Sequence, residues 1–134
     1  MKIKYFLLFA LSVITLNSVN AQKVKFKGDK VLLDGEEVFK FDRKGLGTEI
    51  SIFSLEDNDE ILYMTSNENG TRGYYNDDYI VINFFEQRVK FESEKLSRNW
   101  KKLLATMFKE QVISENGIIN LEKLNKFVSK YSRY

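Results

Sequence analysis

The spacing of apolar residues changes once along the chain, near residue 92, and this change restricts the possible fold more than any other feature. From Lys23 to about Glu92, apolar residues alternate with polar ones or form short runs broken by Gly, Asn and Asp. That pattern is typical of β-strands. From about Ser93 onward, apolar residues recur every three or four positions, as they do on one face of a helix. Because the strands are grouped first and the helices last, the sequence predicts an α+β fold and not alternating βαβ units.

The first part predicts an antiparallel β-meander of about six to seven strands, spanning about 23–92. Asp34-Gly35 separates the apolar run 31–33 from the run 38–41, and Asp-Gly favours the tight type I′ turn of a hairpin. The run Tyr79–Glu86 is apolar on both faces, which is expected for a central strand.

The second part predicts two C-terminal helices, about 94–111 and 121–131, packed on one face of the sheet. Ser93 is the expected N-cap of the first helix, with Ser97 as the alternative, and Asn120 is the expected N-cap of the second. We expect the apolar stripe of the first helix to pack on Ile80, Ile82 and Phe84, or on their opposite-face neighbours Val81 and Phe85. The stripe consists of Leu96, Trp100, Leu103, Leu104, Met107 and Phe108. The inner face of the second helix is expected to carry Leu121, Leu124, Phe127, Val128 and Tyr131.

Residues 1–21 have the layout of a secretory signal peptide. A short basic start with Lys2 and Lys4 precedes an uncharged, mostly apolar run of 12 residues, and Ala21 would end a small-residue cleavage site. The run is too short to span a bilayer, so no transmembrane span is expected after cleavage. The remaining residues, 22–134, would form a single α+β domain in the periplasm or outside the cell.

The composition excludes several classes of function. The chain has no Cys, no His and no Pro, so there is no thiol nucleophile, no imidazole base, no disulfide and no zinc site built on those ligands. Of the 21 basic residues, Lys2 and Lys4 leave with the signal peptide, and 19 remain against 19 acidic residues. Nucleic-acid binding requires a basic surplus, so no nucleic-acid partner is expected.

No phosphate-binding loop, nucleophile elbow or dinucleotide motif is present, and neither a catalytic site nor a metal or cofactor site is predicted. The sequence therefore favours a small exported, non-catalytic binding or interaction module. One alternative is a carboxylate-dependent hydrolase acting on polysaccharide, because paired carboxylates can cleave glycosides without His or Cys. Its candidate acids are Asp34, Asp42, Glu49, Asp77, Asp78 and Glu92. A further alternative is an inhibitor of an extracellular enzyme.

The segment 70–79 has the most unusual local composition, with three tyrosines, one arginine and two aspartates. Tyr and Arg are enriched in recognition surfaces, so the predicted ligand contacts are Arg72, Tyr74, Tyr75 and Tyr79, toward an envelope glycan or protein. The alternative is that these tyrosines cover the edge of the sheet. Lysines 23, 25, 27 and 30 line one face of the first hairpin, where they discourage edge-to-edge aggregation or contact an anionic glycan or membrane.

Three groups of residues carry a resemblance to a known group of proteins. They are the segment Val19-Asn-Ala-Gln22, the opening 24–35 with its Gly28-Asp29 and Asp34-Gly35 turns, and the close 116–128 with Asn116-Gly117 and Asn120. Together they resemble small exported proteins of Bacteroidota bacteria. The resemblance implies a lineage and a compartment, and it carries over no site residues.

Overall fold

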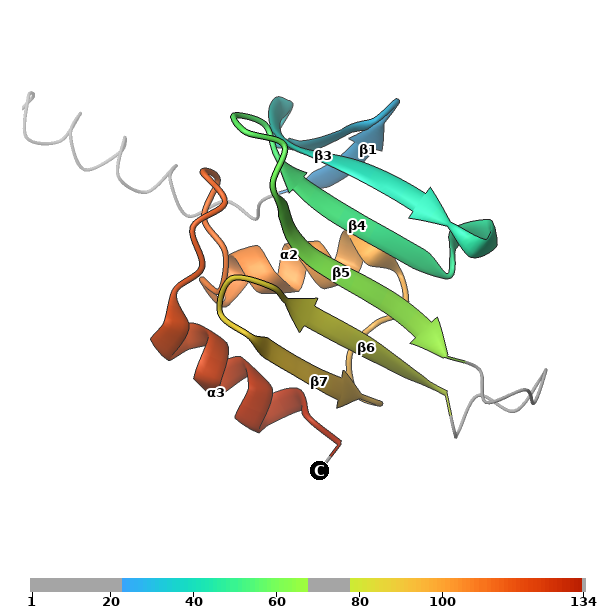
Figure 1. Ribbon diagram of the computed structural model, residues 1–134, viewed down its shortest axis with the longest axis vertical. Coiled ribbons are helices and arrows are strands. Elements are labelled where there is room, and N and C mark those ends of the chain that lie inside the picture. Colours follow the sequence, from blue (N-terminus) through green and yellow to red (C-terminus); the bar gives the residue numbers. More distant parts are fainter. Residues whose placement is uncertain (1–22, 68–77, 134) are drawn as a thin grey trace, which may run out of the picture.

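The computed structural model describes residues 23–67 and 78–133, which form one seven-stranded antiparallel sheet followed by two helices (Figure 1). The strands lie in the sheet in the order of the sequence, so the α+β meander predicted above is confirmed. The expected signal peptide lies outside the described residues. The strands are β1 (Val24–Lys27), β2 (Lys30–Leu33), β3 (Glu36–Lys44), β4 (Glu49–Ser54), β5 (Glu60–Asn67), β6 (Tyr79–Phe84) and β7 (Val89–Ser93), and the helices are α2 (Trp100–Lys109) and α3 (Leu121–Tyr131).

Alternation along the strands gives the sheet an apolar inner face and a mixed outer face. In β6, Ile80, Ile82 and Phe84 are fully buried, whereas Val81 and Asn83 point to the other side and are half-buried. The pairing register extends this division across the sheet, because Ile82 lies opposite Met64 on one side and Phe91 on the other. The first of the two packing arrangements expected for β6 is therefore the one observed.

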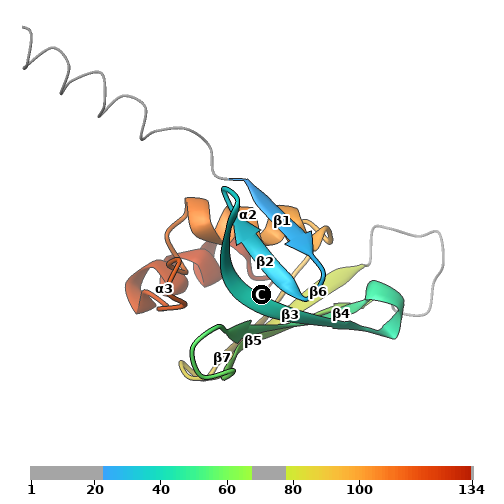
Figure 2. The ribbon, with the colours of Figure 1, turned by 90° about the horizontal axis from the view of Figure 1, so that it is seen from above.

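Both helices cover the inner face, and the sheet curls around them. Figure 2 shows the β1–β2 hairpin turned over toward α2, and β1 and α2 are in contact. The predicted stripe of the first helix is buried in the core, where the ring of Phe108 stacks on Phe39 at 6.0 Å. Phe127 of α3 meets Phe91 of β7 edge-on at 6.0 Å. The outer face of the sheet is on the side away from both helices (Figures 1 and 2).

The first helix begins later than the sequence predicted. Ser93 is not its N-cap, because the hydroxyl of Ser93 accepts from the backbone N–H groups of Lys95 and Leu96 in a turn that does not continue as a helix. Asn99 caps α2 instead, and its side chain accepts from the N–H of Lys102 at 3.2 Å. Leu96 is buried as expected, but it belongs to the connection between β7 and α2.

The second helix begins where the sequence predicted, since the Asn120 side chain accepts from the N–H of Lys123 at 3.1 Å. Leu121, the first residue of α3, was expected on the inner face of this helix, but it is 54% exposed. Leu124 and Phe127 carry the packing. Among residues 23–67 and 78–133, no helix has the length and apolar character needed to cross a membrane.

The two outermost strands of the sheet end differently. β1 is an outermost strand, and Lys25 and Lys27 on it are exposed, as is Lys23 just before it. Along β7, the chain following α3 returns so that the N–H of Arg133 donates to the carbonyl of Glu92 at 2.9 Å. The Arg133 guanidinium also lies within 3.6 Å of the Glu92 carboxylate and 3.1 Å of the Glu94 carboxylate. These contacts fix the last described residues against the sheet.

Candidate functional site

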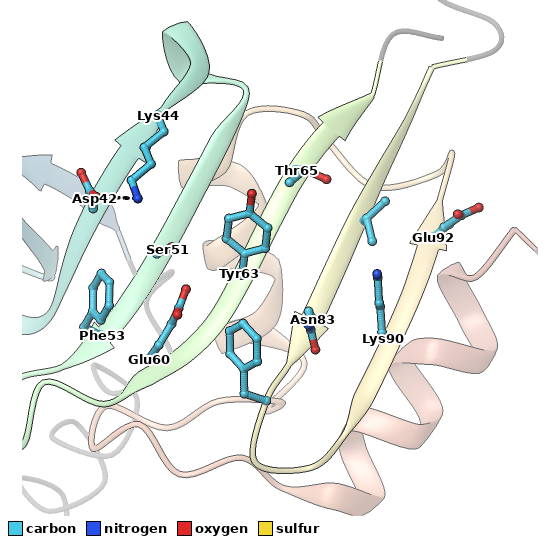
Figure 3. A pocket seen from close by; sticks show the side chains of 12 residues that line it. Asp42, Lys44, Ser51, Phe53, Glu60, Tyr63, Thr65, Asn83, Lys90 and Glu92 are labelled. Carbon is cyan, nitrogen blue, oxygen red and sulfur yellow. Dashed lines mark ion pairs between the residues drawn. The ribbon is translucent and has the colours of Figure 1, made fainter.

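The outer face of the sheet contains an open hollow of about 670 Å³ that spans β3 to β7 (Figure 3). Its wall consists of side chains on the outer face, where alternation places most of them and a register shift between β4 and β5 places Glu60 opposite Phe53. Apart from Phe85, which follows β6, they lie within the five strands. The lining residues are Asp42, Lys44, Ser51, Phe53, Glu60, Tyr63, Thr65, Val81, Asn83, Phe85, Lys90 and Glu92.

A row of side chains runs across the floor of this hollow, perpendicular to the strands. Ser51 lies opposite Tyr63, Tyr63 lies opposite Asn83, and Asn83 lies opposite Lys90. Tyr63 is therefore the large side chain at the centre, flanked by a hydroxyl on one side and an amide on the other. Figure 3 shows the Tyr63 ring between the side chains of β4 and those of β6.

Two further aromatic side chains lie in the hollow. Phe53 is half-buried on β4, and Phe85 is 41% exposed just beyond the end of β6. With Tyr63 they give the hollow three aromatic rings surrounded by hydroxyl, amide, carboxylate and ammonium groups. This combination of apolar surface and convergent polar groups is typical of binding sites for small polar molecules.

Two of the three carboxylates that line the hollow have cationic partners. The Asp42 carboxylate lies 3.9 Å from the Lys44 ammonium, and Glu92 lies 3.6 Å from Arg133. Partial burial, followed by a hydrogen bond with the Glu49 carboxylate, raises the pKa of the Tyr63 hydroxyl. The Tyr63 hydroxyl thus stays protonated at neutral pH and can donate.

Tyr79 is the only predicted contact residue within the described part of the chain, since Arg72, Tyr74 and Tyr75 lie outside it. Tyr79 begins β6 and lies on the outer face beyond Val81. Its hydroxyl accepts from the side-chain amide of Asn67 at 2.8 Å, and the Arg133 guanidinium lies 4.4 Å from the centre of its ring. Tyr79 therefore helps to hold the C-terminal residues against the sheet.

Sequence reasoning missed Phe53, Tyr63 and Phe85 as candidate site residues. The signal was present, because each of them alternates with core residues of the same strand, as Tyr63 does with Leu62 and Met64. A period of two on a strand with one buried face places such a residue on the opposite face. What the pattern did not reveal is that this face is left uncovered by α2 and α3.

Of the acids proposed for a hydrolase, Asp77 lies outside the described part of the chain, and Asp42 and Glu49 are diagonal neighbours on the outer face, since Asp42 lies opposite Ser51 and Lys44 lies opposite Glu49. Asp42 on β3 and Glu92 on β7 are four strands apart, which corresponds to about 19 Å. Carboxylate pairs of glycosidases lie roughly 5–9.5 Å apart. Asp34 accepts from the N–H of Lys23 at 2.8 Å, and Asp78 is held by Arg98 at 2.8 Å.

The acidic turn between β4 and β5 satisfies its own backbone. The Asp57 carboxylate accepts from the N–H of Asp59 at 3.1 Å, and this bond lowers the pKa of Asp57. Within residues 23–67 and 78–133, acidic side chains do not converge in a group of three or more that could hold a metal ion.

Comparison with protein-family models, with curated proteins and with solved structures finds no match to this chain.

Proposed function

We propose that this chain is an exported, non-catalytic binding module that holds an oligosaccharide on the outer face of its sheet. The observation that carries the proposal is the open hollow with Tyr63 at its centre and Ser51 and Asn83 on either side. Sugar rings present an apolar face and a rim of hydroxyl groups. An aromatic ring flanked by hydroxyl and amide groups complements both.

The three aromatic rings and the polar groups would have different roles. Phe53, Tyr63 and Phe85 would supply rigid contact surface, because aromatic side chains lose little rotamer entropy on binding. Asn83 both donates and accepts hydrogen bonds, and the Glu60 carboxylate accepts them. These groups would fix the orientation of the sugar hydroxyls, and catalysis would not be needed.

Residues of the segment 70–79 remain part of the proposal as additional contacts. This segment connects β5 to β6, and its last residue, Tyr79, lies on the same outer face as the hollow. Arg72, Tyr74 and Tyr75 would then add contacts to the same ligand. The change Tyr74→Ala/Tyr75→Ala tests this: unchanged affinity would restrict the ligand to the hollow.

The decisive experiment measures binding of an oligosaccharide panel by glycan array, followed by titration calorimetry on each ligand found. Tyr63→Ala should weaken binding at least about tenfold, since central aromatic contacts commonly contribute 2 kcal/mol or more. Tyr63→Phe should retain most of the affinity, because it keeps the ring.

The matched control is Leu121→Ala, which removes an exposed apolar side chain from α3, in the layer away from the hollow. Binding should be unchanged in this variant. A glycan bound equally well by the wild-type protein and Tyr63→Ala would refute the hollow as the site. Glycan cleavage that is lost on Glu60→Gln would instead favour the hydrolase, and a stable complex with an extracellular enzyme would favour the inhibitor.

Export to the periplasm or the medium, as in the Bacteroidota proteins that the chain resembles, is part of the same proposal. Cleavage after Ala21 would leave a chain that begins at Gln22. Intact mass and N-terminal sequence of the protein recovered from envelope and medium fractions would test it. A chain that keeps Met1 and stays in the cytoplasm would contradict export.

A further inference from the structure

Three lysines lie in register across the first three strands, on the outer face of the sheet. Lys27 of β1 is opposite Lys30 of β2, and Lys30 is opposite Lys40 of β3. The next position in the same row is Phe53 of β4, which lies opposite Lys40 and lines the hollow. The row Lys27–Lys30–Lys40, named here the lysine row, thus leads directly to the aromatic site. It spans two inter-strand spacings and Phe53 adds a third, about 14 Å in all.

This arrangement is unfavourable for the folded chain by itself. Like charges directly opposite each other on neighbouring strands destabilise a sheet, and the row contains two such pairs in succession. Among residues 23–67 and 78–133, no carboxylate forms an ion pair with any of the three. Lys40 donates to the neutral side-chain amide of Asn58 at 2.8 Å, which does not offset its charge.

Protection against edge-to-edge aggregation explains only one of these lysines. Exposed lysines on an outermost strand discourage pairing with another chain, and Lys27 on β1 fits this role. Lys30 and Lys40 lie on β2 and β3, which are already paired on both sides. Their charges therefore need another explanation, and an anionic ligand supplies one.

The carboxylates on the rest of this face are only partly neutralised, because Glu60, which lies opposite Phe53, forms no ion pair within residues 23–67 and 78–133. The Asp42 and Glu92 carboxylates have cationic partners. The lysine row, in contrast, has no carboxylate partner within residues 23–67 and 78–133. The lysine ammonium groups would attract the acidic group of a ligand, and a sugar ring of the same ligand that lies on Phe53 would enter the hollow.

We infer that the ligand of the outer face is an acidic oligosaccharide, with carboxylate or sulfate groups on the lysine row and sugar rings on Phe53 and Tyr63. This inference rests on the proposed function and names the class of sugar that the site binds. A nucleic acid is not needed to explain these contacts, because only one short row of lysines binds the acidic groups and the aromatic rings of the hollow stack on the sugar rings.

The test compares two probes that differ only in charge. One is a carboxylated oligosaccharide, an oligogalacturonate, and the other is the same oligomer with its carboxyl groups reduced to alcohols. Chondroitin sulfate oligomers provide the sulfated arm. The variant is Lys27→Gln/Lys30→Gln/Lys40→Gln, and its matched control is Lys101→Gln/Lys102→Gln/Lys109→Gln on α2, which changes net charge equally at exposed positions away from the sheet's outer face.

The wild-type protein should bind an acidic probe more tightly than the reduced probe, and raising the salt concentration should remove this difference. The lysine-row variant should bind the acidic probe roughly tenfold more weakly, as expected for the loss of three exposed ionic contacts. The α2 variant should bind as the wild-type protein does. The lysine-row variant should also unfold at the same temperature as the wild-type protein or a higher one, because like-charge pairs have been removed.

The two proposals fail in different ways. Equal binding of the acidic and reduced oligomers, with both lost in Tyr63→Ala, would overturn the inference and leave the proposed function intact. Binding that depends on the lysine row but not on Tyr63 would support the row and refute the hollow. Polyglutamate bound as tightly as the acidic sugars would overturn the assignment to a sugar, and binding of none of these probes by the wild-type protein would overturn the inference outright.

Discussion

Removal of the Trp100 side chain tests the packing of the helices on the sheet. Trp100 is the first residue of α2, it is 5% exposed, and it belongs to the core. Its indole Nε1–H donates to the carbonyl of Gly47 at 2.8 Å, which connects the helix to the turn between β3 and β4. The substitution Trp100→Ala therefore removes a large buried ring and one hydrogen bond across the two layers.

The expected loss can be divided between the ring and the hydrogen bond. Replacing a buried Trp by Ala typically costs about 3–5 kcal/mol, including the cavity that remains. The hydrogen bond accounts for about 0.5–1.5 kcal/mol of this, because the carbonyl of exposed Gly47 can be rehydrated. Trp100→Phe keeps most of the apolar surface and should cost roughly 1–2 kcal/mol. Against a typical total stability of about 5–15 kcal/mol, the alanine variant should be strongly destabilised but still measurable.

Urea denaturation followed by circular dichroism would measure both variants, together with the melting temperature. For a domain of this size we expect Trp100→Ala to lower the melting temperature by roughly 12–20 °C. Lys101→Ala, at the exposed neighbouring position, should change stability by less than about 0.5 kcal/mol. A Trp100→Ala protein whose free energy of unfolding lies within about 1 kcal/mol of the wild-type value would refute this packing, since removal of a large buried ring costs more stability than that.

Three further predictions concern individual contacts of the fold, each measured by equilibrium unfolding. Gly28 and Gly45 both have positive φ, at 62° and 60°, so Gly28→Ala should cost about 1 kcal/mol of stability. Gly45→Ala should cost more, because its added Cβ would also lie 2.5 Å from the Thr48 Oγ1. Equal losses in the two variants would contradict this. Asn120→Ala should lose about 1 kcal/mol through the N-cap of α3, and an unchanged stability would show that the cap is dispensable. Burial, and to a smaller extent a hydrogen bond to the Glu110 carboxylate, raises the pKa of Tyr131 above its usual 10.0. The stability that this shift contributes should be complete below pH 10 and should fall as the pH rises toward the folded-state pKa. Tyr131→Phe should make this alkaline fall shallower.

The division into strands and helices was predictable because it depends on local periodicity. Every predicted strand is present, and the Asp34-Gly35 turn has positive φ at both residues, as a type I′ turn requires. The start of α2 was not predictable in the same way. Ser93, Ser97 and Asn99 are all residues that cap helices, and local sequence does not decide among them. Ser93 is buried on the inner face at the end of β7, opposite Ile80, so pairing within the sheet decides the outcome.

The candidate site was harder to predict than the fold, because a binding face depends on which side of the sheet the helices cover. The composition of the segment 70–79 directed attention to Tyr79, and the structure places Tyr79 under Arg133, from the other end of the chain. The row through Tyr63 comes from four strands and appears only once the register between them is known. Residues that are far apart in the sequence therefore form one site only when their strands pair, and the sequence alone does not show it.

Tyr63 places a large aromatic ring at the centre of the outer face. Aromatic residues on an exposed sheet face can stabilise the sheet through cross-strand pairs with other aromatic or β-branched residues. Tyr63 has Ser51 and Asn83 as its direct neighbours on the two adjacent strands, so neither an aromatic nor a β-branched side chain lies directly opposite it. The helices do not cover the ring either, since α2 and α3 lie on the other face. A large ring on an open, polar face is therefore explained better by a bound partner than by folding, and a stability unchanged in Tyr63→Ala, together with lost binding, is the result that this reasoning requires.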